Sequence, residues 1–129
     1  MAEGIFKKLI GRKIFVQSAG IFDTLEIDGF TVKVCDEINV KLNKHRVRSL
    51  REMEQNGGFT GSFDLIISLT KESLVEAYRY STYSSVLIED WNVDEPIKNE
   101  NDIKQTLESY RQTRDVIFDK IKTRFQNYI

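Results

Sequence analysis

The sequence of 129 residues contains one cysteine, one histidine and one proline, and this scarcity excludes several classes of protein. A single cysteine cannot form an internal disulfide, so the chain is not a disulfide-stapled scaffold. One histidine and one cysteine without a cluster of further ligands give no basis for a metal site. We therefore expect no metal and no cofactor.

The sequence also lacks an excess of either charge, and it lacks long apolar runs. The sequence has 19 basic against 20 acidic residues, which leaves a net charge of −1. This balance gives no reason to expect nucleic acid or an acidic membrane as a partner. The apolar runs are far too short to span a bilayer, and the N-terminal residues do not have the pattern of a cleaved leader. We expect a cytoplasmic protein with a single domain over residues 1–129.

What is present is an alternation of helical and strand patterns. The first ten residues place Ile5, Phe6, Leu9 and Ile10 at helical spacing. The run FDLIISL at 63–69 is apolar throughout, as in strands that are buried on both faces of a parallel sheet. Thr70 is a candidate N-cap for the next helix, and Asn101 or Asp102 for the last. We expect helices at 2–10, within 49–57, and at about 71–81 and 101–127, and strands at 13–20, 63–69 and 84–90.

The segment from Asp28 to Leu42 is ambiguous. Asp28-Gly29 between apolar runs indicates a hairpin, whereas Phe30, Val34 and Ile38, spaced four apart, fit one face of a helix. The glycine-rich stretch 55–62 is the best candidate for a flexible segment, but it is too short to divide the chain. Alternating strands and helices with buried strands predict an α/β fold with a parallel sheet.

Several segments, read in order, carry a resemblance. They are MAEGIFKKLIG, VQSAG, HRVRSL, FDLIISLTKES, DWNVDEP and YRQTRDVIFDKIKTRF. Together they resemble the low-molecular-weight protein tyrosine phosphatase and arsenate reductase family, almost from end to end. The resemblance implies a doubly wound, three-layer α/β domain around a small parallel sheet. It also implies a helix rather than a hairpin at 29–39.

The resemblance implies that an active-site loop is missing. Family members are hydrolases that carry a phosphate-binding loop of the form C-x5-R-S/T directly before the segment that matches MAEG. We therefore expect an N-terminally truncated domain without the first central strand, the nucleophilic cysteine and the phosphate-holding arginine. Met1 is then either the true start or an internal methionine. As given, the chain is predicted to be inactive toward phosphotyrosine and arsenate, between which the sequence does not decide.

The resemblance assigns roles to four residues. In WNVDEP, Glu95 stands directly before Pro96, where the family usually has the aspartate that protonates the leaving group, and Asp94 is the neighbouring alternative. A solvated acidic loop is the competing interpretation. Ser18 and His45 match members of a buried hydrogen-bond network that steadies the phosphate-binding loop.

Cys35 is the one residue that could replace the missing nucleophile, because Lys41 follows it six positions later and imitates C-x5-R. Asp36 and Glu37 would repel a phosphate dianion, and lysine lacks the bidentate fork of arginine. We expect a buried, inert thiol.

The remaining expectations concern packing and partners. We expect partly buried packing for Tyr78, Tyr80 and Tyr83, and a solvated face for the basic residues of the last helix. These residues are Arg111, Arg114, Lys120, Lys122 and Arg124. The alternative to a truncated enzyme is a non-enzymatic binding or regulatory module. Its partner would be a phosphoprotein or another phosphate or oxyanion ligand, and a homodimer would complete the sheet.

Overall fold

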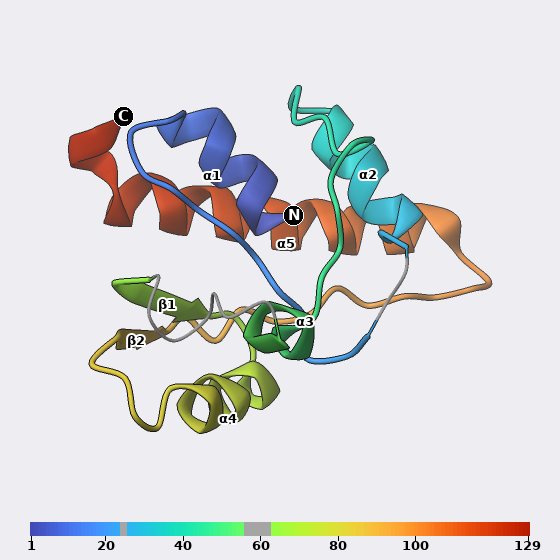
Figure 1. Ribbon diagram of the computed structural model, residues 1–129. Helices are drawn as coiled ribbons and strands as arrows, with labels where there is room; N and C mark the ends of the chain where they lie inside the picture. The colour runs from blue at the N-terminus through green and yellow to red at the C-terminus, as the bar shows by residue number, and fades with distance from the viewer. Residues whose placement is uncertain (24–25, 56–62) are drawn as a thin grey trace. The chain divides into compact units, whose positions relative to one another are not determined.

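The computed structural model describes residues 1–23, 26–55 and 63–129. Most of the predicted flexible stretch at 55–62 therefore lies outside the described residues. The chain divides into two compact units. The first contains Met1–Ser18, Glu26–Arg46 and Glu95–Ile129, and the second contains Ala19–Leu25 and Val47–Asp94. Figure 1 shows the elements of each unit in chain order.

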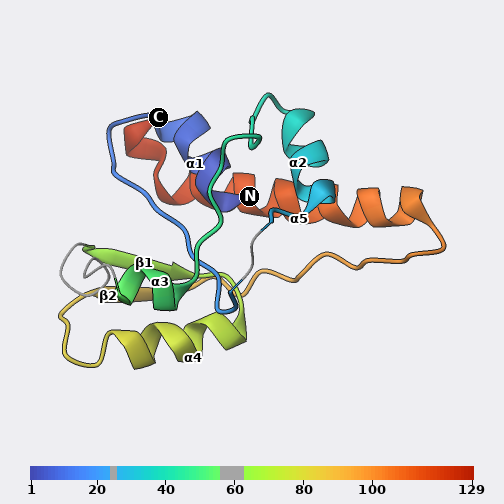
Figure 2. The same cartoon turned by 45° about the vertical axis from the view of Figure 1, so that its right-hand side comes forward.

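The first unit is helical. It contains α1 (Ala2–Ile10), α2 (Gly29–Asp36), α5 (Ile103–Arg124) and the short 3-10 helix η1 (Gln126–Tyr128). Both α1 and α2 pack against α5 (Figure 2). The ring of Phe6 meets that of Phe125 edge to face, with 5.0 Å between centroids. The unit therefore joins helices from the two ends of the chain.

Local signals explain where these helices begin and end. Asp28 accepts a hydrogen bond from the backbone N–H of Phe30 and begins α2, and Asp102 accepts one from Gln105 and begins α5. Gly11 ends α1 with a φ of 69°, a conformation that glycine adopts without strain. The helix predicted at 29–39 is confirmed, although it ends at Asp36.

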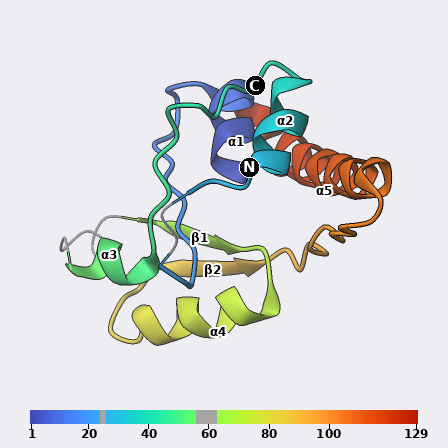
Figure 3. The ribbon, with the colours of Figure 1, turned by 90° about the vertical axis from the view of Figure 1, so that its right-hand side faces the viewer.

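The second unit contains a small parallel sheet. Its strands are β1 (Leu65–Ser68) and β2 (Leu87–Asp90), paired from Leu65 opposite Leu87 to Ser68 opposite Asp90. The connecting helix α4 (Lys71–Tyr80) contacts both strands, and α3 (Leu50–Gln55) precedes them in the chain (Figure 3). Thr70 and Ser73 form a capping box at the start of α4, which confirms the predicted cap. The α/β class and the small parallel sheet are confirmed.

The strand predicted at 13–20 is wrong. Within the described residues, this segment forms only an isolated parallel bridge from Gly20 to Ser49, and the sheet has two strands. The segment still alternates as a strand does, because residues 14, 16 and 18 are half-buried and residues 13, 15 and 17 are exposed. Packing one side of an extended segment is enough to produce that alternation, whereas a strand also needs a hydrogen-bonded neighbour.

Candidate functional site

A buried carboxylate organises the best candidate site, and all of its contacts lie within the first unit. Glu3 is 4% exposed. Its Oε1 accepts hydrogen bonds from the backbone N–H of Ser18 at 2.7 Å and from the Ser18 hydroxyl at 2.9 Å. Its Oε2 accepts from Lys7 Nζ at 2.9 Å and lies 3.3 Å from His45 Nδ1. We call Glu3, Lys7, Ser18 and His45 the Glu3 network.

The position of Glu3 on α1 explains its burial. Phe6 and Ile10, three and seven residues further on, are buried core residues, so Glu3 lies on the same side of the helix as they do. A carboxylate in the first helical turn is stabilised by the positive end of the helix dipole. Lys7 is one turn further along, at the spacing of a favourable Glu-to-Lys pair. The buried face of α1 therefore carries a charge that its own helix partly compensates.

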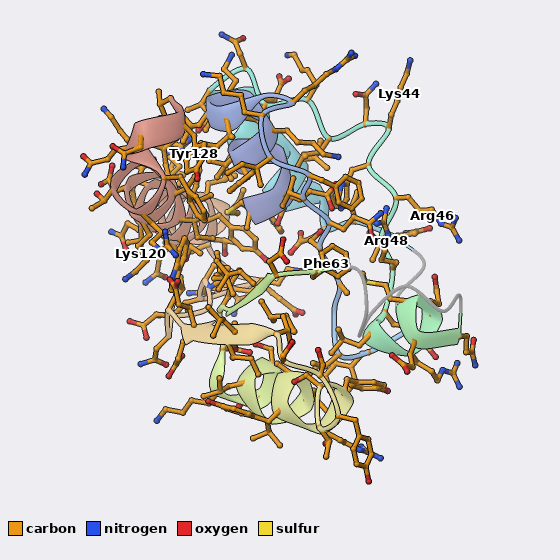
Figure 4. All side chains as sticks on the ribbon, turned by 60° about the vertical axis from the view of Figure 1, so that its left-hand side comes forward. Lys44, Arg46, Arg48, Phe63, Lys120 and Tyr128 are labelled. Carbon is orange, nitrogen blue, oxygen red and sulfur yellow. The ribbon has the colours of Figure 1, made fainter. Side chains whose placement is uncertain are left out.

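Close packing brings His45 to this carboxylate. A Cβ atom at Gly4 would lie 2.6 Å from Leu42 Cδ2 and 2.8 Å from Val40 Cγ1, so the missing side chain lets α1 approach these two buried residues. From there the chain leads to His45, which is half-buried. Its neighbours Lys44 and Arg46 are exposed and point outward (Figure 4).

The surroundings keep the Glu3 carboxylate ionised. Burial by itself would raise the pKa of Glu3, but the hydrogen bonds from Lys7 and Ser18 and the charge of His45 outweigh it, and the pKa falls below its ordinary value. A carboxylate with a lowered pKa is ionised near neutral pH, so it accepts hydrogen bonds and has no proton to donate. Glu3 is therefore suited to hold its neighbours in place rather than to transfer a proton.

The structure thus brings together Ser18 and His45, which the sequence singled out, through a residue that sequence reasoning missed. A signal for Glu3 was present: an acidic residue three positions before Phe6 and seven before Ile10 falls on the apolar face of a helix. A charge at such a position is rarely fully buried unless it is paired.

The two candidate proton donors lie on the surface and belong to different units. Asp94 ends the second unit and Glu95 begins the last segment of the first, and both are exposed. They follow Asn92, whose φ of 45° turns the chain after β2, and Val93, which is buried. The assignment of either carboxylate as a proton donor stays a prediction.

Cys35 is buried, as predicted. Its exposed fraction is 0%, and burial raises the pKa of its thiol. Cys35 is the second-to-last residue of α2. The last residue of this helix, Asp36, accepts a hydrogen bond from Lys41. Lys41 is thus engaged by a carboxylate, whereas the C-x5-R pattern would use a base at this position to hold phosphate.

Two other predictions about side chains are corrected. The tyrosines are not jointly packed: Tyr78 and Tyr83 are exposed, and only Tyr80 is half-buried. Arg114 does not lie on a solvated face, because it is buried and its Nη1 donates to the backbone oxygen of Val34 at 2.9 Å and to Glu37 Oε1 at 2.8 Å. It ties the end of α2 to α5.

No group of three or more histidine, cysteine, aspartate or glutamate side chains in the described part of the chain is arranged to hold a metal ion. Among the same residues, no helix has both the length and the apolar character needed to cross a bilayer.

Comparison with known protein families gives one result. The family described as low molecular weight phosphotyrosine protein phosphatase matches residues 1–128. No curated protein matches the chain.

Proposed function

Because the chain belongs to the low-molecular-weight phosphotyrosine protein phosphatase family, we propose that the Glu3 network supports a phosphate-binding loop and does not itself react. We further propose that these 129 residues on their own do not hydrolyse phosphate monoesters. The observation that carries this second proposal is the burial of Cys35, the sole cysteine of the sequence.

The family reaction requires a thiolate that can reach phosphorus. Reactive thiolates occur where the pKa of the thiol is lowered, for example at a helix N-terminus or beside a cation, and where the sulfur is accessible. At Cys35 burial dominates: it raises the pKa of the thiol although the positive charges of the Met1 amino group and of Arg114 lower it, and the sulfur is not accessible. Cys35 also lies at the C-terminal end of α2, where the helix dipole disfavours an anion.

The neighbours of Cys35 also argue against a phosphate ligand. Asp36 and Glu37 follow it directly, and two carboxylates beside a sulfur would repel a phosphate dianion. The bases nearby are engaged: Lys41 pairs with Asp36, while Arg111 and Arg114 both pair with Glu37. The cations that would hold a phosphoryl group are thus held by the chain's own acids.

The Glu3 network is suited to a supporting role. One ionised carboxylate accepts from Ser18 and Lys7 and faces His45, so it fixes the first turn of α1 against two other segments. A helix N-terminus whose position is fixed in this way provides oriented backbone N–H groups for a loop that precedes it. In a protein that supplies such a loop, Glu95 would act as the proton donor, with Asp94 as the alternative.

The alternative function is a non-enzymatic binding or regulatory module derived from the same fold. It would bind a phosphoprotein or a phosphate or oxyanion ligand without turnover. Titration of the chain with phosphotyrosine, followed by calorimetry, separates this function from the first. Binding without hydrolysis favours the module, and its absence removes that alternative.

The test of inactivity is an assay of aryl phosphate hydrolysis with the 129-residue chain and with Cys35→Ser. The substitution removes the thiol with little change in volume. We expect no turnover above the uncatalysed rate for either protein. Turnover by the unaltered chain that disappears in Cys35→Ser would overturn the proposal.

The DNA upstream of Met1 provides a second test. An in-frame C-x5-R-S/T motif preceded by an apolar strand would identify the chain as part of an active phosphatase, and the Glu3 network as the support of its loop. An in-frame stop codon directly upstream would favour the binding module.

A further inference from the structure

The segment that follows Glu95 is held by hydroxyl groups of α5, within the first unit. It runs beside the first half of α5 before it enters that helix (Figure 2). The N–H of Ile97 donates to Ser109 Oγ at 2.6 Å. The N–H of Asn99 donates to Thr106 Oγ1 at 2.8 Å, and the Thr106 hydroxyl donates to the Asn99 carbonyl oxygen at 2.9 Å. Two side chains one turn apart on α5 thus bind the backbone of this segment.

The bond from Ile97 to Ser109 is not needed to begin α5. Asp102 is the N-cap of this helix and accepts a hydrogen bond from the N–H of Gln105. Capping side chains satisfy the free N–H groups of the first turn, whereas Ser109 lies in the second turn. Its hydroxyl reaches back to a residue that precedes the cap. The bond therefore holds the segment before the helix rather than the helix itself.

Burial of apolar side chains does not hold this segment. Ile97 is 70% exposed, and Lys98 is exposed as well. The Nζ atom of Lys98 lies 5.4 Å from the centre of the Phe30 ring, which adds one contact from α2. A cation–π contact at an exposed site is weak. The hydrogen bonds to α5 are therefore the stronger attachment of the segment.

We propose that Ser109 is a positioning residue that fixes the backbone of Glu95, an inference that rests on the proposed function of Glu95 as the proton donor. Pro96 is the one residue between Glu95 and the anchored Ile97. Its ring fixes its own φ and restricts the residue before it to extended conformations, so the anchor reaches Glu95 through a stiff link. A proton donor must lie within hydrogen-bond reach of the group that it protonates. An exposed carboxylate such as that of Glu95 meets this requirement when its backbone is held.

NMR relaxation and amide exchange of the 129-residue chain test this role. In the unaltered chain we expect the backbone amides of Glu95 and Ile97 to have the order parameters of a rigid backbone, about 0.85. In Ser109→Ala these order parameters should fall below about 0.6, and the Ile97 amide, which loses its acceptor, should exchange roughly tenfold faster. Ser109→Thr keeps a hydroxyl and should restore both measurements. Alanine favours a helix, so α5 should stay intact and the Ile117 amide should exchange as before.

The matched control is Thr123→Ala, because Thr123 is an exposed hydroxyl residue in the last turn of the same helix. We expect this control to leave the order of Glu95 unchanged. Unchanged order of Glu95 and Ile97 in Ser109→Ala would overturn the proposal. So would a loss of order that Ser109→Thr does not restore, or faster exchange throughout α5, because the Ser109 hydroxyl would then not be what fixes Glu95. These measurements do not depend on hydrolysis, so the role of Ser109 and the proposed function fail in different experiments.

Discussion

Replacing Glu3 with alanine is the sharpest test of the Glu3 network. The change removes the acceptor for the Ser18 N–H, the Ser18 hydroxyl and Lys7 in one step, and leaves the two Ser18 donors without their partner. A hydrogen bond to a charged group contributes about 1.5–3 kcal/mol to the free energy of unfolding. A buried donor that is left without a partner lowers that free energy by about 1–3 kcal/mol more. We expect Glu3→Ala to lower the free energy of unfolding by about 3–5 kcal/mol, a large part of the total for such a chain.

A double-mutant cycle isolates one bond of the network. Ser18→Ala removes the hydroxyl donor and keeps the backbone N–H, so the coupling energy between Glu3→Ala and Ser18→Ala reports the hydroxyl–carboxylate bond. We expect about 1–3 kcal/mol. The measurement is urea unfolding followed by far-ultraviolet circular dichroism, which reports the helices of the first unit.

The matched control is Glu72→Ala. Glu72 also occupies the first turn of a helix, α4, but it is exposed. We expect its replacement to cost less than about 1 kcal/mol. If Glu3→Ala costs no more than this control, or if the coupling energy to Ser18 is below about 0.5 kcal/mol, the carboxylate does not organise the site and the supporting role fails.

Two further predictions concern the ion pairs between α2 and α5. Hydrogen bonds from Arg111, more than those from Arg114, lower the pKa of Glu37 from its ordinary 4.5 to about 2. Its contribution to stability is therefore full above pH 4.5 and is lost as the pH falls toward 2. As the pH is lowered from 4.5 to 2, the urea midpoint of unfolding should fall less steeply for Glu37→Gln than for the unaltered chain. Midpoints of the two proteins that fall in parallel with pH would contradict this prediction. Arg114→Met should lower the free energy of unfolding by about 1.5–3 kcal/mol, because the backbone oxygen of Val34 loses a buried donor. Arg111→Met should lower it less, because Arg111 is at the surface. Equal losses in urea unfolding would refute that order.

Much of the fold was predictable because its signals are local. Apolar spacing predicted α1, and Thr70 was predicted as the N-cap of α4. For α5 the sequence offered Asn101 or Asp102, and Asp102 is the cap. The segments predicted as strands at 63–69 and 84–90 both contain a strand. These patterns depend on the chain's own neighbours in sequence, which a single sequence contains.

The errors share one physical cause: they depend on what packs beside a residue. The segment 13–18 has the alternation of a strand, but strand pairing requires a second backbone. Arg114 has the spacing of a surface base, yet its side chain reaches the backbone oxygen of Val34, 80 residues earlier in the chain. Tyr78 remains exposed on α4, and Tyr83 is exposed in the turn that follows this helix. Of the candidate site, Ser18 and His45 were found through the resemblance, while Glu3 was overlooked.

The pairing of α1 with α5 has a consequence for how the protein is made. α1 leaves the ribosome long before Phe125, whose ring packs against that of Phe6. Residues 47–94, which contain β1, α4 and β2, form a continuous stretch that is complete before α5 is synthesised. The second unit can therefore collapse first, while the apolar face of α1 waits for a partner more than 90 residues away. During that interval α1 presents Ile5, Phe6 and Ile10 to solvent or to a chaperone, and synthesis interrupted before α5 leaves α1 without that packing partner.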